Sequence, residues 1–263
     1  MQILGILNVT PDSFSDGGRV MSADGVLDVA AAVAYAERMI AEGADAIDVG
    51  GVSTRPGADP VDEVEELRRV LPVVGALQGL PVWVDTARGR VAEAVLNAGA
   101  CGINDQRAGD DPLLLAVVAA AGCSCVLMHN RGTPQTMGTL AAYDDVCGDV
   151  WAELAQVAAR ACAAGVGVDR VILDPGIGFA KTAAQSVALL RDLPRRTGVP
   201  VLIGASRKSF LGVLTGRASP SERLPGSLAV AIHAWRAGAA WVRVHDVRAT
   251  RDALTVAAAM EAG

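Results

Sequence analysis

Residues 81–104 read PVWVDTARGRVAEAVLNAGACGIN and contain one complete strand–helix–strand unit. The apolar run 81–84 stops at Asp85, and the apolar run 101–103 stops at Asn104. Both runs are short and do not alternate with polar residues, as is typical of parallel strands that are buried on both faces. The segment between them has helical character and ends before a glycine, where a helix C-cap is expected. The stretch therefore predicts a βαβ unit with a polar side chain at the end of each strand.

The same unit recurs along the whole chain. The apolar runs are 3–7, 46–49, 81–84, 101–103, 123–128, 171–173, 200–203 and 241–244. The polar residues that stop them are Asn8, Asp48, Asp85, Asn104, His129, Asp174, Ser206 and His245. A first candidate helix ends before Gly43, and the others cover 61–77, 89–97, 111–121, 144–164, 183–195, 221–237 and 248–262. Eight strands that alternate with helices, each strand ending in a hydrogen-bonding group, predict an α/β fold of the (β/α)8 TIM-barrel type.

We expect the barrel to occupy residues 1–263 as a single domain, because α/β barrels of about 250 residues commonly form one unit. Three of the connections that follow strands are unusually long, namely 9–23, 50–60 and 130–143. These loops follow the first, second and fifth strands. Loops in this position surround the mouth of a barrel, so they are candidate lids over an active site.

The composition argues against several classes of protein. A net charge of -6 and an aromatic content of 3% disfavour a nucleic-acid surface, which needs basic groups and stacking side chains. Five cysteines without paired CxxC motifs indicate reduced thiols. The longest uncharged apolar stretch, 112–128, is too short to span a bilayer, and Met1 leads directly into the first strand without a signal peptide. We expect a soluble, cytoplasmic protein that binds neither nucleic acid nor membrane.

Basic side chains gather at the predicted mouth. The chain has only two lysines, Lys181 and Lys208, which follow the sixth and seventh strands. Arg243 and His245 end the eighth strand on one face, at a spacing of two residues. Loops after the seventh and eighth strands often bind phosphate in such barrels, so Lys208, Arg243 and His245 predict a site for an anionic substrate group. An ion pair with a surface carboxylate explains Arg207 more simply.

Two carboxylates at strand ends also point to a ligand. An unpaired carboxylate at the buried end of a strand is costly, so Asp85 and Asp174 need hydrogen-bond donors. A ring with adjacent N–H groups, such as an aminopyrimidinone, would supply two donors at once. Asn104 adds a donor and an acceptor that could read the rest of the ring edge. The pattern predicts a site for a flat, nitrogen-rich ligand.

Alternatives remain open for these carboxylates. Asp85 and Asp174 could instead cap helices, or they could pair with a basic neighbour such as Arg88 or Lys208. Asp48, which ends the second strand, has no comparable need for a ligand, and we assign it to the structure.

Specific motifs stand in the loops that follow the strands. In chain order they are ILNVTPDSFSDGG (6–18), STRPG (53–57), DT (85–86), ND (104–105), LMH (127–129), RGTP (131–134), DPGIGF (174–179), GASRKSF (204–210) and RVHD (243–246). This ordered set resembles the dihydropteroate synthase family, the folate-pathway enzymes that sulfonamides inhibit. The resemblance spans the whole chain.

The resemblance implies the condensation of 6-hydroxymethyl-7,8-dihydropterin pyrophosphate with 4-aminobenzoate, giving 7,8-dihydropteroate and pyrophosphate. It implies that pyrophosphate departs first and that the arylamine then attacks a cationic methylene group on the pterin. It also implies Mg²⁺ as cofactor, with Asn8 helping to position the metal, and a homodimer.

The resemblance also assigns residues to each ligand. The expected pterin contacts are Asp85, Asn104, Asp174, Lys208, Met128 along the pocket wall and Arg243 stacked on the ring. The expected pyrophosphate contacts are Asn8, Arg243 and His245. The expected 4-aminobenzoate contacts are Thr54, Arg55, Pro56, Phe179, Lys208 and Ser209. The catalytic roles fall to Asn8, Asp85, Asp174, Lys208, Arg243 and His245.

The chain departs from the family pattern at two places. Gln106, Arg107 and Ala108 stand where the family usually has a small apolar residue followed by Ser-Gly, and Val52 replaces a common glutamate. Gln106 would lie where an aliphatic side chain supports the pterin, so we expect a change to valine to do no harm or to tighten binding.

Other functions are compatible with parts of the sequence. An inactive or weakly active pterin-binding paralogue would bind the ligand without turnover. A pterin-dependent methyltransferase domain shares the barrel and the pterin carboxylates, but it would have no reason to keep the STRPG loop. Residues 176–182 resemble a phosphate-binding P-loop only superficially, because Pro175 and Ala180 occupy the positions that must be glycine.

Overall fold

The computed structural model describes residues 1–10, 20, 26–54, 57–193 and 199–261 of the chain. The strands are β1 (Gln2–Asn8), β2 (Ala46–Gly50), β3 (Val82–Asp85), β4 (Gly102–Asp105), β5 (Ser124–Met128), β6 (Val171–Asp174), β7 (Leu202–Ile203) and β8 (Trp241–Val244). The helices are α1 (Val29–Ala41), α2 (Glu63–Ala76), α3 (Gly89–Asn97), α4 (Pro112–Ala121), α5 (Val146–Ala163), α6 (Ala183–Asp192), α7 (Ser209–Thr215), α8 (Leu224–Arg236) and α9 (Val247–Glu261). Short 3-10 turns cover Met137–Thr139, Val168–Arg170 and Pro220–Arg223.

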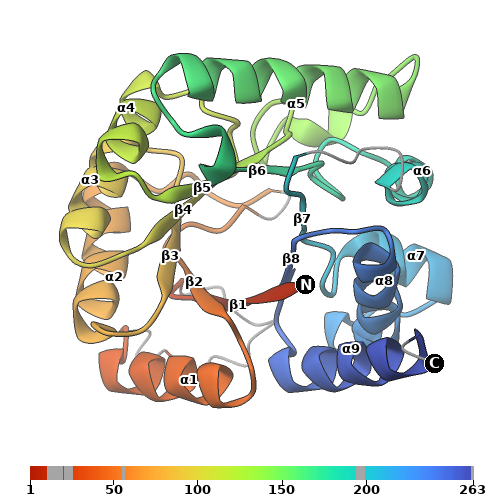
Figure 1. Cartoon of the computed structure of the whole chain (residues 1–263), viewed down its shortest axis with the longest axis horizontal. Coiled ribbons are helices and arrows are strands. Elements are labelled where there is room, and N and C mark those ends of the chain that lie inside the picture. Colours follow the sequence, from red (N-terminus) through yellow and green to blue (C-terminus); the bar gives the residue numbers. More distant parts are fainter. Residues whose placement is uncertain (11–19, 21–25, 55–56, 194–198, 262–263) are drawn as a thin grey trace.

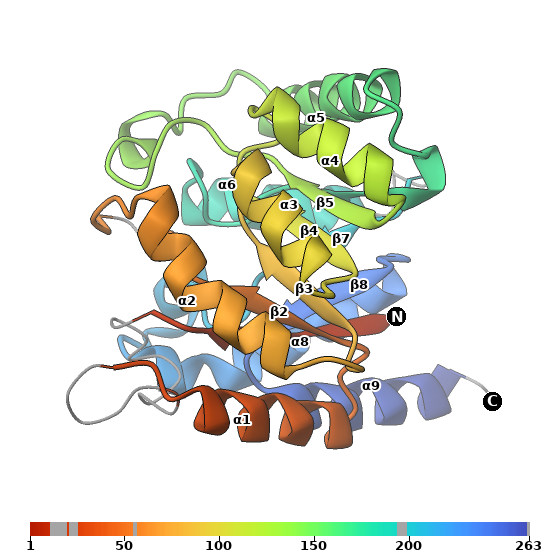
Figure 2. The same ribbon diagram turned by 90° about the vertical axis from the view of Figure 1, so that its left-hand side faces the viewer.

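The strands form one eight-stranded sheet in the order β6-β5-β4-β3-β2-β1-β8-β7, and all of its strand pairs are parallel. A parallel bridge between Leu173 of β6 and Val201, just before β7, joins the two ends of this order. The Leu173 amide also donates a 2.9 Å hydrogen bond to the Pro200 carbonyl. The helices surround the sheet in Figure 1 and form its outer layer in Figure 2. The predicted TIM barrel is confirmed.

One apolar residue from each of seven strands packs inside the barrel. These residues are Leu4, Ala46, Trp83, Val126, Ile172, Leu202 and Trp241. The rings of Trp83 and Trp241 lie 4.9 Å apart and fill much of this layer. A Cβ atom at Gly102, the β4 position beside Trp83, would lie 2.6 Å from that ring, so only glycine fits there. The apolar layer closes the interior of the barrel below the carboxyl ends of the strands.

Above the apolar layer, toward the carboxyl ends of the strands, lies a second layer of side chains, which is polar. Its members also point into the barrel, because side chains two residues apart on a strand point the same way. Asp85 follows Trp83 by two residues on β3, and Arg243 follows Trp241 by two residues on β8. Asp48, Asn104 and Asp174 stand in the same relation to Ala46, Gly102 and Ile172. The strand period therefore carries the predicted site residues to one level, above the apolar layer.

Side-chain caps fix where several helices begin. Asp28, Asp62, Asp111, Asp145 and Thr182 each accept a hydrogen bond from a backbone amide in the first turn of α1, α2, α4, α5 and α6. Such caps satisfy amides that have no partner within the helix. Each helix therefore starts at a defined distance after its strand, which sets the length of the loop at the mouth.

The structure differs from the predicted ranges in detail. Helix α8 begins at Leu224 rather than at residue 221, because Pro220–Arg223 forms a 3-10 turn. Helix α7 has only 7 residues, too few for a periodic apolar pattern, and the predicted ranges omit it. Strand β7 has 2 residues. Long connections follow β1, β2 and β5, as predicted. Within the described residues, no helix combines the length and apolar character needed to cross a membrane.

Candidate active site

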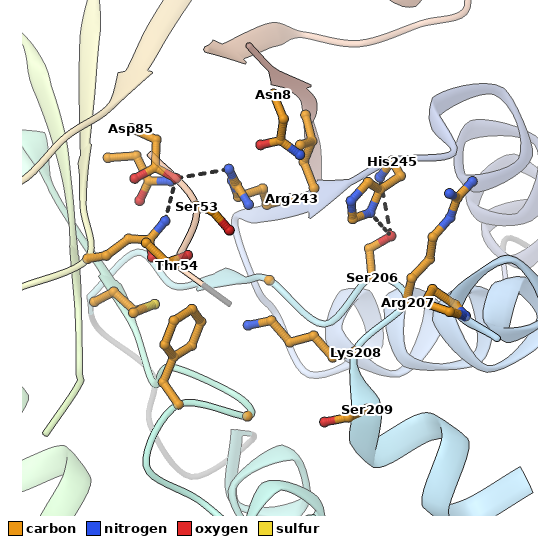
Figure 3. A pocket seen from close by; sticks show the side chains of 18 of the residues that line it. Asn8, Ser53, Thr54, Asp85, Ser206, Arg207, Lys208, Ser209, Arg243 and His245 are labelled. Atoms are coloured by element: carbon orange, nitrogen blue, oxygen red, sulfur yellow. Dashed lines mark hydrogen bonds and ion pairs between the residues drawn. The ribbon is translucent and has the colours of Figure 1, made fainter. Parts of the chain in front are cut away.

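The carboxyl ends of the strands surround a cavity of about 800 Å³. The predicted site residues that line it are Asn8, Thr54, Asp85, Asn104, Met128, Asp174, Phe179, Lys208, Ser209, Arg243 and His245. In Figure 3, Asp85 and Thr54 lie on one side, His245 and Ser206 lie on the other, and Arg243 lies between them. Arg55 and Pro56, also predicted for this site, lie outside the described residues.

Arg243 is the central cation of the site. Its Nε atom donates to Oδ2 of Asp48, and its Nη2 atom lies 3.1 Å from Oδ2 of Asp85. Burial alone would lower the pKa of this guanidinium, but Asp48 and Asp85 outweigh burial and raise the pKa. Arg243 therefore stays charged and joins β8 to β2 and β3.

Asp48 has the structural role that the sequence predicted, and the structure shows what it holds. Its side chain is completely buried, and its Oδ2 atom accepts a 2.9 Å hydrogen bond from Nδ2 of Asn104 besides the bond from Arg243. One carboxylate thus orients two residues that line the cavity. Because the Asn104 amide nitrogen binds Asp48, its carbonyl oxygen is the group left to meet a ligand.

Asp85 has partners that the sequence did not indicate. Its Oδ2 atom accepts hydrogen bonds from Arg243 and from Nε2 of Gln106, whereas Arg88 pairs with Glu66 instead. Burial is the largest influence on the pKa of Asp85 and raises it to about 8, although Arg243 and Gln106 act in the opposite direction. Gln106 is therefore a hydrogen-bonding member of the site and does not merely fill the place of an aliphatic side chain.

Asp174 and Lys208 form the second charged group of the cavity. Asp174 accepts a 2.7 Å hydrogen bond from the Gly176 amide, and Lys208 donates a 2.6 Å hydrogen bond to the Ile177 carbonyl. Burial raises the pKa of Asp174, an effect that Lys208 partly offsets, and burial lowers the pKa of Lys208 to about 8. The Lys208 ammonium also lies 4.4 Å from the centre of the Phe179 ring.

The far side of the cavity is built around His245. Its Nδ1 atom lies 3.0 Å from Oγ of Ser206, which also accepts from the His245 amide at 3.2 Å. Arg207 forms a two-bond ion pair with Asp246, at 2.6 and 2.9 Å, which is the ion pair with a carboxylate that was expected from the sequence. Arg223, from the turn before α8, also lines the cavity. No pattern in the sequence pointed to Arg223, and Ser206 was identified only as a strand end within the GASRKSF motif.

Asn8 ends β1 at the edge of the cavity and is half-buried. Gly50 lies next to it, and a Cβ atom at that position would lie 3.4 Å from Oδ1 of Asn8 and 3.7 Å from Cβ of Asp85. Glycine therefore keeps space beside the Asn8 carboxamide oxygen. Among the residues that the structure describes, no three His, Cys, Asp or Glu side chains gather into a metal site of their own.

Comparisons with known proteins show the family to which the chain belongs. The family model described as pterin binding enzyme matches residues 4–245. The dihydropteroate synthase of Synechocystis sp. is 45% identical over 264 residues, covering 98% of this chain and 89% of the relative. The chain also matches a solved structure of Xanthomonas albilineans dihydropteroate synthase with 4-aminobenzoic acid, at a TM-score of 0.90 and 46% identity, covering 100% of this chain and 93% of that one.

A second structure of the Xanthomonas albilineans enzyme, in complex with 7,8-dihydropteroate, matches at a TM-score of 0.86 and 43% identity, covering 100% of this chain and 94% of that one. Family model, relatives and structures each cover nearly the entire length of the chain. The chain therefore belongs to the dihydropteroate synthase family of pterin-binding enzymes.

Proposed function

We propose that this cavity condenses 6-hydroxymethyl-7,8-dihydropterin pyrophosphate with 4-aminobenzoate to give 7,8-dihydropteroate and pyrophosphate, in folate biosynthesis. The observation that carries the proposal is the division of the cavity into two chemically different sides. In Figure 3 the acceptor Asp85 lies on one side and His245 on the other, with the donor Arg243 between them, and Asn104 and Asp174 add further oxygen acceptors to the cavity lining. A substrate with a nitrogen-rich ring and an anionic tail matches both sides.

The pterin ring occupies the acceptor side in this proposal. Asp174 and Asp85 accept from the ring N–H groups, and the free carbonyl oxygen of Asn104 accepts a further N–H. Lys208 donates to ring heteroatoms from beside Asp174, and Met128 provides an apolar contact. The burial of these groups supports the assignment, because a buried carboxylate is stabilised by ligand donors that replace lost water.

The pyrophosphate lies between Asn8, Arg243 and His245. Arg243 stays charged beside Asp48 and Asp85, so it can donate to an anion in every state of the site. His245 is oriented by Ser206 through Nδ1, which turns Nε2 toward other partners. These donors stabilise the charge that develops on the departing pyrophosphate.

Asn8 fits a role in holding Mg²⁺. This ion takes oxygen ligands and commonly uses one or two protein groups together with substrate phosphates. The Asn8 carboxamide oxygen at the cavity edge, with space beside it at Gly50, suits such a site. When bound, Mg²⁺ would supply positive charge that neutralises the pyrophosphate.

The 4-aminobenzoate occupies the outer part of the cavity, between Thr54, Phe179, Lys208 and Ser209. The Phe179 ring offers an aromatic face, the aliphatic stem of Lys208 offers an apolar contact, and Ser209 offers a donor for the carboxylate. By the family resemblance, Arg55 and Pro56 complete this part. The arylamine then attacks the pterin methylene group, and the nearby carboxylates of Asp85 and Asp174 stabilise the positive charge on the ring.

We further propose that residues 1–263 form one pterin-binding domain that acts in the cytoplasm as a homodimer. The free thiols of all five cysteines support a reducing compartment. The family resemblance supports the dimer.

Pyrophosphate release tests the proposed function. The protein, given the pterin pyrophosphate, Mg²⁺ and 4-aminobenzoate, should release pyrophosphate continuously, and the Asp174→Asn protein should release it much more slowly. Equal release by both proteins would show that the cavity is not where the reaction occurs. Tight pterin binding without any release would favour the inactive paralogue.

A further inference from the structure

Lys181 is one of the two lysines of the chain, and it is not among the residues that line the cavity. Its ammonium group lies 3.0 Å from Nδ1 of His129 and donates a 2.9 Å hydrogen bond to the carbonyl oxygen of Phe179. His129 follows β5, whereas Phe179 belongs to the loop after β6. A single side chain therefore connects the ends of two neighbouring strands.

The orientation of His129 is fixed from its other side. Its Nε2 atom lies 2.9 Å from Oε2 of Glu153 on α5, and Glu153 also pairs with Arg131. Burial, with the nearby charge of Lys181, lowers the pKa of His129 to about 4, so the ring is neutral near pH 7. Nε2 then carries the hydrogen and donates to Glu153, and the lone pair of Nδ1 accepts from Lys181.

A second observation places the same two segments in intimate contact. Gly176 has a φ of +65°, and a Cβ atom there would lie 1.9 Å from the carbonyl oxygen of His129. Any side chain at this position would collide with the backbone after β5. Gly176 therefore allows the loop after β6 to pack directly against the end of β5. Lys181 holds the same loop at Phe179, three residues later.

Phe179 connects this junction to the cavity. Its ring lines the cavity, and the Lys208 ammonium lies 4.4 Å from the ring centre. The carbonyl oxygen of the same residue accepts the hydrogen bond from Lys181. Loss of that hydrogen bond would release the carbonyl group of Phe179, the one aromatic residue that the described cavity offers to the second substrate, while the Phe179 amide would still donate to the Gly176 carbonyl at 3.0 Å.

We propose that Lys181 is a positioning residue for 4-aminobenzoate. By binding both the Phe179 carbonyl and His129, Lys181 holds the Phe179 ring beside Lys208. This inference rests on the proposed function, in which Phe179 flanks the aromatic substrate. It assigns to Lys181 its main effect on the second substrate, because Lys181 binds the Phe179 carbonyl directly, whereas it acts on the pterin contact Asp174 through its charge.

The test is calorimetric binding of 4-aminobenzoate to the protein saturated with Mg²⁺, pyrophosphate and a dihydropterin. Lys181→Met keeps the aliphatic stem and removes the amino group, and it should weaken 4-aminobenzoate binding by up to about tenfold, as expected for loss of one intramolecular hydrogen bond. Pterin affinity should stay within about twofold. Arg251→Met is the matched control, since Arg251 also binds a backbone carbonyl, that of Gly43, but at the opposite end of the barrel.

A double-mutant cycle with Phe179→Leu decides how Lys181 acts. If it acts through Phe179, the Lys181→Met change should have little further effect on 4-aminobenzoate binding in the Phe179→Leu protein. Additive effects, an equal loss of pterin affinity, or unchanged 4-aminobenzoate binding would each overturn the inference. Should the Lys181→Met protein fail to fold, Lys181→Arg, which keeps the charge but not the compact shape, is measured in the same cycle. Because binding is measured directly, a protein that binds both ligands without turnover would contradict the proposed function but not the positioning role of Lys181.

Discussion

Gln106 donates a side-chain hydrogen bond to Oδ2 of Asp85, the same oxygen that lies 3.1 Å from Nη2 of Arg243. Gln106 is only 8% exposed, and its Oε1 atom has no hydrogen-bond partner among the described residues. One end of this amide therefore supports the Asp85 carboxylate, while the other end remains an acceptor without a protein donor. The polar substitution at this place in the family pattern has a definite contact in the site.

Replacing Gln106 with methionine, which has similar length, should weaken pterin binding about tenfold, because the buried Asp85 carboxylate loses a hydrogen bond. This reverses the expectation from sequence that an apolar residue would be harmless here. The pKa of Asp85 should also rise further above about 8, since the hydrogen bond from Gln106 lowers it. We therefore expect the pH at which pterin binding strengthens to be higher in the variant than in the wild type, as measured by calorimetry from about pH 6 to about pH 9. Identical affinities at every pH would mean that Gln106 only fills space.

Replacing Asp174 with asparagine should reduce pterin affinity by about tenfold or more, because the amide replaces an anionic acceptor with a mixed donor and acceptor. Calorimetry on the folded variant measures the effect. Asp169→Asn is a suitable control, since the Asp169 side chain is 76% exposed and forms an ion pair with its neighbour Arg170 in the turn before β6. An Asp174→Asn protein that binds pterin as well as the control would contradict the assignment of Asp174.

Replacing Arg243 with methionine should destabilise the protein by about 3–5 kcal/mol, the typical effect of leaving buried charges without their partner. Asp48 and Asp85 would both lose their ion pair. Arg251→Met breaks a half-exposed pair with Asp45, so it should change the free energy of unfolding by at most about 1 kcal/mol. Urea denaturation of the two variants measures the difference, and equal losses would argue against a central role for Arg243 in the fold.

Lys181 should make stability depend on pH in the alkaline range. Burial lowers its pKa in the folded protein from 10.5 to about 7, so between these values the unfolded chain binds a proton that the folded protein lacks. Raising the pH then favours the folded state by about 1.4 kcal/mol for each pH unit. The groups that face Lys181 and could alter this slope are His129, Asp174, Lys208, Arg131, Glu153 and Tyr143.

The difference in unfolding free energy between the wild-type and Lys181→Met proteins isolates the contribution of Lys181. Urea denaturation near pH 7 and near pH 10 should give a difference that shifts in favour of the wild type at the higher pH. A difference that does not change with pH would show that Lys181 keeps its ordinary pKa in the fold.

Sulfonamides, which imitate 4-aminobenzoate, should bind poorly to the free protein and much better when Mg²⁺, pyrophosphate and a pterin are present. The loops around Asn8 and Thr54 contain Gly17, Gly18 and Gly51 and many polar residues, so burial alone gives them little reason to adopt one closed shape. An anion and a metal would supply the missing partners. Residues 11–19 and 55–56 of these loops lie outside the described residues. Equal sulfonamide affinity in both conditions, found by titration, would contradict this order of binding.

The sequence was sufficient to predict the barrel and the placement of most predicted site residues around one cavity, because side chains alternate with a period of two along a strand. Asp85 and Asp174 end apolar runs of parallel strands, and the parallel strands of a barrel bring their carboxyl ends to the same end of the barrel. The level of the site inside the barrel follows from the same period, since Trp83 and Trp241 precede Asp85 and Arg243 by two residues.

The pairings within the site could not be predicted from the sequence. Arg243 and Asp85 are 158 residues apart, and Arg243 had several carboxylates within reach, so only the closed barrel selects its partners. The place of Lys181 in a loop after β6 suggested a side chain at the mouth. It turns instead toward His129, because Gly176 seats the loop on the end of β5. Contacts of this kind depend on loop conformation, which has no periodic signal in the chain.

The formation of product tests the central claim most directly. The purified protein is incubated with 6-hydroxymethyl-7,8-dihydropterin pyrophosphate, Mg²⁺ and isotopically labelled 4-aminobenzoate, and the products are separated and weighed by mass spectrometry. The account predicts labelled 7,8-dihydropteroate in amounts that exceed the protein many times over and that fall sharply in the Asp174→Asn variant. Binding of both substrates without any labelled product, under conditions in which a known dihydropteroate synthase forms it, would contradict the account.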